Sequence, residues 1–248
     1  MALIKDYVFS SGFSSVRQLQ AAGQSPAGSA APNGISDRIA VGYAPDMRPC
    51  CVTRIAMTDA ETALGIRSEM AFDLEPLAER WYVWGTYLPD DFPSDLYSIF
   101  QVHDTPDNGD NPRYPNFIVV TEGRWLRIEM PKRVLPTETT ENVVFGRVPL
   151  PTGRWFTQCL HVKWAQDSTG FLEYIIDGVV LYRECLTANQ YVDVVGPYAK
   201  IGLYDAFHTG SFAPAVAYFD RLKVFDSGET YVSVLGAPPK PKPRAVVV

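Results

Sequence analysis

The sequence of 248 residues lacks the features that mark membrane proteins and nucleic-acid-binding proteins. No run approaches the roughly 20 consecutive apolar residues that a membrane-spanning helix needs, so no membrane partner is expected. Positive charge is not in excess either: 22 Lys and Arg stand against 28 Asp and Glu, giving a formal net charge of −6. Because surfaces that bind duplex nucleic acid carry clustered basic residues, nucleic acid is not expected as a partner.

Cysteine is scarce and its spacing is uninformative. The sequence holds Cys50, Cys51, Cys159 and Cys185, which show no metal-type spacing, and no disulfide framework is expected. Cys159 and Cys185 fall in strand-like runs and are interpreted as small core residues. The N-terminus, MALIKDY, lacks the apolar segment and cleavage site of a signal peptide, so we expect synthesis in the cytoplasm without secretory export.

Aromatic and turn-forming residues are abundant instead. The chain is 46% hydrophobic, with 13 Phe, 13 Tyr and 5 Trp, which is enough to bury a sizeable core. Short β-branched and aromatic runs predict strands, and Asp177-Gly178 marks a hairpin. The predicted strands are 81–88, 96–103, 117–121, 125–130, 155–164, 171–176, 179–183, 198–204 and 217–226. Strands at this spacing without intervening amphipathic helices predict an all-β fold, a two-sheet antiparallel β-sandwich of the jelly-roll type.

Only two short stretches, 14–22 and 58–64, carry helix signals. A single β-jelly-roll domain is expected over 1–232, interrupted by a long Pro- and Gly-rich loop near 23–48. Residues 233–248 are Pro- and Lys-rich and predict an extended C-terminal arm. An ordered arm of this composition would be held against partner subunits, as in a large assembly.

Three predicted strands combine an apolar face with a face of polar, chemically useful side chains. Because side chains alternate across a strand, Arg67 shares a face with Glu69, and Gln101 shares one with His103. In the third strand the polar face carries Tyr198, Lys200 and Tyr204. If these strands belong to one sheet, its outer surface carries a polar groove lined by aromatic residues.

The motifs RSE, QVH and YxKxGxY, in this order, resemble those of the jelly-roll polysaccharide lyases: alginate lyases, glucuronan lyases and heparin lyase I. The segments WYVWGTYLPDDFP and PLPTGRWFTQCLHVKWAQDSTGFLEYIIDGVVLYRE are similar to sections of the same group. The resemblance implies a concanavalin A-like sandwich that binds an acidic polysaccharide and cleaves it by β-elimination, without metal or cofactor. It also implies a catalytic set of Arg67, Gln101, His103 and Tyr204, and substrate-binding roles for Glu69, Tyr198 and Lys200.

The resemblance leaves the catalytic tyrosine open, since both Tyr198 and Tyr204 match tyrosines of such enzymes. The two lie roughly 20 Å apart along an extended strand, so they cannot act on one bond. We favour Tyr204. Other candidates have plainer interpretations. Arg67 and Glu69 can form a surface pair, His161 shares a strand face with Lys163, and His208 lies in a Gly-Ser loop. The loop 104–110 lacks the spacing of a calcium-binding loop.

Two features weigh against a secreted, working lyase. A net charge of −6 does not favour capture of an acidic polymer. The absence of an export signal is explained if the protein is a component of a virus particle, such as a bacteriophage depolymerase released by lysis. The alternative is a non-catalytic structural or decoration protein of a viral particle, which uses the jelly roll for assembly or for lectin-like glycan binding.

Overall fold

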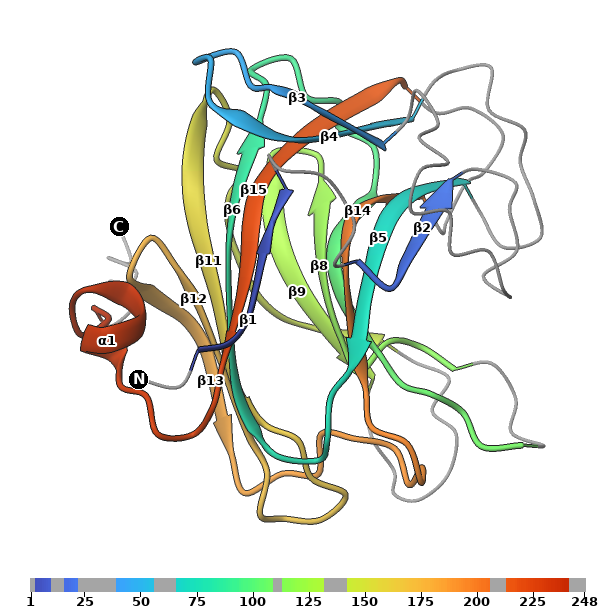
Figure 1. The fold of residues 1–248 in the computed structure, drawn as a ribbon, viewed down its shortest axis with the longest axis vertical. Coiled ribbons are helices and arrows are strands. Elements are labelled where there is room, and N and C mark those ends of the chain that lie inside the picture. The colour runs from blue at the N-terminus through green and yellow to red at the C-terminus, as the bar shows by residue number, and fades with distance from the viewer. Residues whose placement is uncertain are drawn as a thin grey trace, which may run out of the picture.

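The computed structural model describes residues 3–9, 16–21, 39–55, 66–108, 113–131, 142–205 and 213–240. Two antiparallel sheets form a β-sandwich, as the alternating strands predicted (Figure 1). The first sheet has eight strands in the order β13-β12-β11-β6-β15-β4-β3, with β1 also paired to β15. The second has seven strands in the order β10-β9-β8-β7-β14-β5-β2. No helix in the described part of the chain is long and apolar enough to cross a membrane.

The strands of the eight-stranded sheet come from both ends and the middle of the chain. They are β1 (Leu3–Val8), β3 (Ile39–Tyr43), β4 (Pro49–Ile55), β6 (Glu79–Leu88), β11 (Arg154–Lys163), β12 (Phe171–Ile176), β13 (Val179–Cys185) and β15 (Ala215–Phe225). The seven-stranded sheet contains β2 (Gln18–Ala21), β5 (Ile66–Leu74), β7 (Tyr97–His103), β8 (Phe117–Glu122), β9 (Trp125–Pro131), β10 (Asn142–Pro149) and β14 (Tyr198–Asp205).

Aromatic side chains from both sheets fill the space between them. Trp84 of β6 stacks on Phe100 of β7, with ring centroids 3.9 Å apart, and Tyr174 of β12 contacts Phe117 of β8 at 5.4 Å. Each aromatic side chain buries a large apolar area, so these contacts hold the two layers at a fixed distance. The core therefore fixes which face of each strand is turned away from it.

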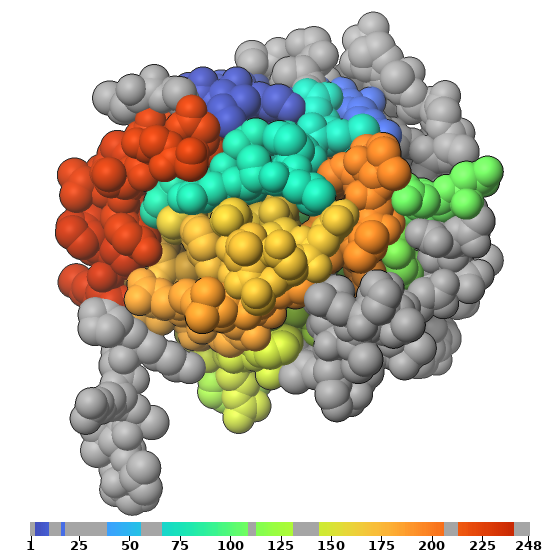
Figure 2. Space-filling model, turned by 90° about the horizontal axis from the view of Figure 1, so that it is seen from below, coloured from blue at the N-terminus to red at the C-terminus, as the bar shows by residue number. Residues whose placement is uncertain are grey.

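One end of the sandwich is closed by three connections that bind one another (Figure 2). The connection between β5 and β6 accepts and donates backbone hydrogen bonds: Trp164 N to Ala78 O at 3.2 Å, and Glu75 N to Pro197 O at 2.8 Å. Residues 186–197, between β13 and β14, also contact the β11–β12 connection through Asn189 N and Ala165 O at 3.0 Å. This end fixes the position of Asp193, which bears on the candidate site.

Several expectations about the chain's minor elements are wrong. The helix expected at 14–22 is contradicted over Gln18–Ala21, which forms β2 and pairs with β5. The loop expected near 23–48 contains β3. The helix expected at 58–64 and the Pro- and Gly-rich stretch 24–34 lie outside the described residues.

The C-terminal arm does not begin as an extended segment. Helix α1 (Tyr231–Leu235) crosses the expected boundary and packs against the outer side of the eight-stranded sheet, over Trp81 and Cys159 (Figure 1). Lys240 N then donates to Gly178 O, and Val180 N donates to Lys240 O at 2.9 Å. The described part of the arm is thus bound to its own sheet, and 241–248 lie outside the described residues.

The four cysteines are free thiols. Cys50 and Cys51 are buried on opposite faces of β4. Cys159 is buried under α1, as expected of a small core residue. Cys185 is exposed, so its assignment to the core is wrong. It stands at the last position of edge strand β13, where no layer covers it.

Candidate functional site

The three strands predicted to carry polar faces are neighbours in the seven-stranded sheet, in the order β7-β14-β5. Their registers place Tyr198 opposite His103, Lys200 opposite Gln101, and Tyr204 opposite Arg67. Residues between them on the same strands, such as Phe100 and Ile201, lie in the core. The seven predicted side chains therefore share the outer face of one sheet. We call them the polar cluster: Arg67, Glu69, Gln101, His103, Tyr198, Lys200 and Tyr204.

The polar cluster is more deeply buried than a solvated sheet surface. Glu69 and Gln101 are each 1% exposed, Lys200 is 4% exposed and Arg67 is 6% exposed. The interpretation of Arg67 and Glu69 as a surface pair is therefore wrong. His103, Tyr198 and Tyr204 are partly exposed, so a ligand reaches them first.

Glu69 and Gln101 form the centre of the cluster. Gln101 Nε2 donates a hydrogen bond to Glu69 Oε1, and Arg67 Nη1 lies 4.0 Å from Glu69 Oε2. Glu69 faces Gly202 across the β5–β14 register, where the two backbones approach so closely that an added Cβ would lie 2.6 Å from Glu69 Cα. Gln101 Oε1 and Glu69 Oε2 are buried without a hydrogen-bond partner. Unsatisfied buried acceptors are uncommon, so these two single out the centre of the cluster.

His103 is held by the residue that follows it. Its Nδ1 lies 2.8 Å from Asp104 Oδ1 and 3.1 Å from the Asp104 carbonyl oxygen. Both neighbours are acceptors, so they favour the tautomer in which Nδ1 carries the proton and Nε2 carries the lone pair. The geometry thus leaves Nε2 free to accept a proton from a ligand.

Asp104 is fully buried and belongs to an ion-pair network that sequence reasoning missed. Arg113 donates to Asp104 Oδ2 from Nε at 2.9 Å, and its Nη2 lies 2.5 Å from Asp193 Oδ1. Arg113 also lies over the ring of Tyr191, 4.4 Å from its centroid. The network ties the His103 end of the cluster to the closed end of the sandwich. The only sequence signal for it is the acidic residue next to His103.

Tyr198 lies between two cations beside His103. Its ring centroid is 5.8 Å from that of His103, 5.5 Å from Lys200 Nζ and 5.3 Å from Arg17 Cζ. Arg17 is exposed and was not predicted from the sequence. Burial, with a smaller contribution from Glu69, raises the pKa of Tyr198 to about 12. Burial also lowers the pKa of Lys200, and Glu69 opposes that shift.

Tyr204 occupies a different part of the cluster. Arg67 lies over its ring, with Cζ 4.3 Å from the centroid. Burial raises the pKa of Tyr204, and Arg67 partly offsets the shift. Tyr204 faces Ser98 on β7, five residues from His103, which corresponds to roughly 17 Å along the strand. The structure therefore brings His103 together with Tyr198, and Arg67 together with Tyr204, but it does not bring His103 to Tyr204.

The remaining candidates do not join the cluster. His161 lies on the other sheet, where its ring stacks on Trp81 at 3.4 Å and its Nε2 lies 2.9 Å from Glu79 Oε1. His208 lies outside the described residues, as do positions 109 and 110 of the loop considered for calcium. In the part of the chain that the structure describes, no group of three or more His, Cys, Asp or Glu side chains is placed to hold a metal ion.

Comparisons with known proteins agree with this architecture. A family model described as "Polysaccharide lyase" matches residues 44–223. An endo-β-1,4-glucuronan lyase from the fungus Trichoderma reesei superposes with a TM-score of 0.70 at 17% identity, covering 94% of this chain and 98% of that one. An alginate lyase from Pseudomonas aeruginosa gives a TM-score of 0.54 at 18% identity, with 78% and 87% covered.

A third structure, an alginate lyase from a Chlorella virus, gives a TM-score of 0.53 at 11% identity, covering 76% of this chain and 89% of that one. At these identities the structures are similar in fold. The search of curated proteins found no match. The resemblance to jelly-roll polysaccharide lyases that the motifs indicated is thus confirmed for the glucuronan and alginate lyases.

Proposed function

The chain belongs to the polysaccharide lyase family, whose model matches residues 44–223, and on this premise we propose that it cleaves a uronic-acid-containing polysaccharide by β-elimination. The observation that carries the proposal is the pairing of His103 with Tyr198 on one sheet face, with His103 Nδ1 held by Asp104. A base and an acid that lie side by side are what an elimination across one C–C bond requires.

The reaction begins by removal of the proton from C5 of a uronate, which is weakly acidic because the neighbouring carboxylate is charged. We assign Lys200 and Arg17 to that carboxylate, since both cations flank Tyr198. Fixed positive charge in a partly buried site stabilises the enolate-like charge that develops on the carboxylate. Arg67 adds a third cation at the other side of Glu69.

His103 Nε2 accepts the C5 proton, because Asp104 holds the other ring nitrogen in its protonated form. The Asp104 carboxylate then stabilises the imidazolium. Tyr198, whose pKa is raised to about 12, remains protonated at neutral pH and donates its hydroxyl proton to the leaving glycosidic oxygen at C4. A C4–C5 double bond forms as the C4–O bond breaks. After the product leaves, His103 releases its proton to solvent and Tyr198 takes one up, which restores both groups.

This assignment moves the catalytic role from Tyr204 to Tyr198 and gives Tyr204, with Arg67, a substrate-binding role. One similar alginate lyase was solved with the substrate GGMG in a variant whose His and Tyr are replaced by Asn and Phe. That variant supports the choice of a His and a Tyr as the base and the acid of this chain. Glu69 and Gln101 lie beneath these groups, where the Gln101 amide donates to the Glu69 carboxylate and Glu69 faces Arg67.

The test is incubation with alginate, glucuronan and heparin-type polymers, following the ultraviolet absorbance of the unsaturated uronate. We expect Tyr198→Phe to lower kcat by about 100-fold or more, and Tyr204→Phe, the matched control, to retain most of it. Loss in Tyr204→Phe with activity kept in Tyr198→Phe would restore the earlier assignment. No absorbance rise with any of the polymers would refute the lyase proposal.

Glycan binding without cleavage is the second candidate, and the depth of the cluster favours it. Glu69, Gln101 and Lys200 are almost fully buried, so a polymer would contact mainly the partly exposed Tyr198, Tyr204 and His103. Retention of the protein in an alginate-containing native gel, with no product formed, would favour this candidate over the enzyme.

We propose further that the protein is a component of a virus particle. The support is an alginate lyase from a Chlorella virus with a similar fold, together with the Pro- and Lys-rich composition of the C-terminal arm. Mass spectrometry of purified particles from the source of this sequence tests the proposal. Detection of the protein in particles at a fixed ratio to the major coat protein is the expected result, and its absence would refute the association.

A further inference from the structure

A second depression lies on the same sheet as the polar cluster, at the edge strand β10. It is a cavity of about 400 Å³, which we call the edge pocket. Glu122 of β8, Trp125 and Arg127 of β9, and Val144 and Arg147 of β10 line it. Nothing in the function proposed above uses these residues.

The edge pocket opens on the same face of the sheet as the polar cluster. On β9, Leu126 and Ile128 lie in the core, so Trp125 and Arg127, which alternate with them along the strand, face outward. The registers place Ser98 opposite Val120, Val120 opposite Arg127, and Arg127 opposite Arg147. Since Ser98 also faces Tyr204, one row of residues crosses the sheet from the polar cluster to the pocket.

The distance along this row exceeds a single sugar unit. Tyr204 of β14 and Arg147 of β10 are separated by four strand spacings, which amounts to roughly 19 Å. A ligand in the edge pocket is therefore not the sugar that reacts beside Tyr198. It can be a more distant unit of the same polymer.

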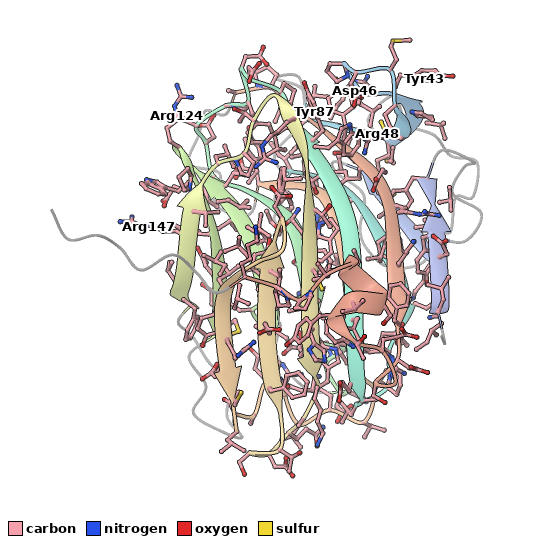
Figure 3. The ribbon with its side chains drawn as sticks, turned by 90° about the vertical axis from the view of Figure 1, so that its left-hand side faces the viewer. Tyr43, Asp46, Arg48, Tyr87, Arg124 and Arg147 are labelled. Carbon is pink, nitrogen blue, oxygen red and sulfur yellow. The ribbon has the colours of Figure 1, made fainter. Side chains whose placement is uncertain are left out.

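Trp125 and Arg147 form the chemically distinctive part of the pocket. The guanidinium carbon of Arg147 lies 4.7 Å from the ring centroid of Trp125, and Trp125 is 40% exposed. Figure 3 shows Arg147 projecting outward at this edge of the molecule. Among the described residues, no carboxylate lies within ion-pair distance of Arg147.

Arg48, which also stacks on a tryptophan, and Arg127, which lies beside Arg147, both pair with carboxylates. Arg48 lies over Trp155 at 4.6 Å, but it also lies 3.8 Å from both Asp46 and Asp220. Arg127, within the pocket, pairs with Glu122 and with Glu129. Of the two described arginines that stack on tryptophan, Arg147 is thus the one without an ion pair to a described carboxylate, so its charge is available to a ligand.

We propose that the edge pocket binds a uronate unit of an acidic polysaccharide, remote from the bond that is cleaved. The guanidinium of Arg147 takes the sugar carboxylate in a bidentate contact, the geometry that carboxylates favour with arginine. The exposed part of the Trp125 ring covers the apolar side of the sugar, and the half-exposed Glu122 carboxylate accepts from its hydroxyl groups. The inference rests on the proposed function only for the identity of the polymer.

The experiment compares Arg147→Ala and Trp125→Ala with the matched control Arg48→Ala, which removes a stacked arginine from the other sheet. Binding is measured as retardation in native gels that contain alginate or glucuronan, and cleavage is measured on the polymer and on the shortest oligomer that the wild type cleaves. We expect the pocket variants to bind polymer about tenfold more weakly and to show a KM for polymer raised by a similar factor. Cleavage of the short oligomer should not change.

The outcomes separate the two proposals. If the wild type cleaves no polymer, the lyase function fails, and the gels still decide the edge pocket: weaker retardation of Arg147→Ala than of Arg48→Ala supports it. Equal retardation of Arg147→Ala and Arg48→Ala overturns it. If the pocket variants lose activity on polymer and oligomer alike, their effect is structural and the inference is also overturned.

Discussion

Replacement of Asp104 by asparagine tests whether this carboxylate acts through His103. Asp104 Oδ1 lies 2.8 Å from His103 Nδ1, and Asp104 is fully buried. Once the imidazolium forms, this close contact becomes a charge-assisted interaction, which contributes about 1.5–3 kcal/mol in such a site. Because the imidazolium forms only as the C5 proton is transferred, most of that energy should appear in the barrier. Each 1.36 kcal/mol corresponds to a tenfold change in rate, so we expect Asp104→Asn to lower kcat by roughly 10- to 150-fold.

The structure provides a matched control for this substitution. Asp193 is the other carboxylate on Arg113, with 2.5 Å between Asp193 Oδ1 and Arg113 Nη2, and it does not contact His103. Asp193→Asn therefore removes a partner of the same buried arginine and should cost a similar free energy of unfolding, on the order of 2 kcal/mol.

Initial rates of unsaturated uronate formation and urea-unfolding midpoints are measured for both variants. The expected result is a comparable loss of stability in both, with the large loss of kcat confined to Asp104→Asn. If the two variants lose kcat equally, Asp104 only supports the fold and the proposed role of the His103 tautomer is wrong.

Three further predictions follow from the buried groups. Burial lowers the pKa of Lys200, and only its charged form binds the carboxylate. We therefore expect kcat/KM to fall at alkaline pH, below the ordinary lysine pKa of 10.5, and Lys200→Arg to move that fall to higher pH. The same alkaline fall in Lys200→Arg would exclude Lys200 as its source. Burial lowers the pKa of His161 below 6.5, so the unfolded chain binds the proton more tightly and stability should decrease as pH falls through about 6.5. We expect the urea-unfolding midpoint of His161→Gln to depend less on pH than that of the wild type. An equal pH dependence of the two midpoints would contradict this prediction. Gly202 has φ of 145° and an added Cβ would lie 2.1 Å from Ser68 O, so Gly202→Ala should lower the free energy of unfolding by about 2 kcal/mol or more. Gly123 has φ of 59° and open space around it, so Gly123→Ala should cost only about 1 kcal/mol. Equal unfolding midpoints for the two variants would refute the steric argument.

The sandwich could be predicted because its central strands obey the alternation of side chains across a sheet. In β11, Leu160 and Val162 lie in the core while Cys159 faces the other way, as their spacing requires. Strand β10 was not predicted, since a register shift between Val144 and Gly146 interrupts its alternation. The helix expected at 14–22 failed because its Gln, Leu and Ala residues favour a helix locally, whereas pairing with β5 determines the structure.

The candidate site was predicted only as far as strand periodicity reaches. The seven residues of the polar cluster follow from which side chains share a face. Their partners do not: Arg113 and Asp193 are 80 residues apart in sequence and meet through the closed end of the sandwich. The choice between Tyr198 and Tyr204 also required the register of β14 against β7, and the sequence of one strand does not determine that register.

The net charge of −6 does not decide whether an acidic polymer can bind, because the charge that a ligand meets is local. Interactions between exposed charges are largely screened beyond about 8 Å at physiological ionic strength. Around Tyr198 and Tyr204 lie three cations, Arg17, Arg67 and Lys200, against the carboxylates of Glu69 and Asp205, while Asp104 and Asp193 pair with Arg113. Arg147 adds an uncompensated cation at the far edge of the same face. Many of the acidic residues counted in the total are paired elsewhere, as Asp6 is with Arg221 and Asp177 is with Arg154, so an acidic chain can still present a cationic face to a uronate polymer.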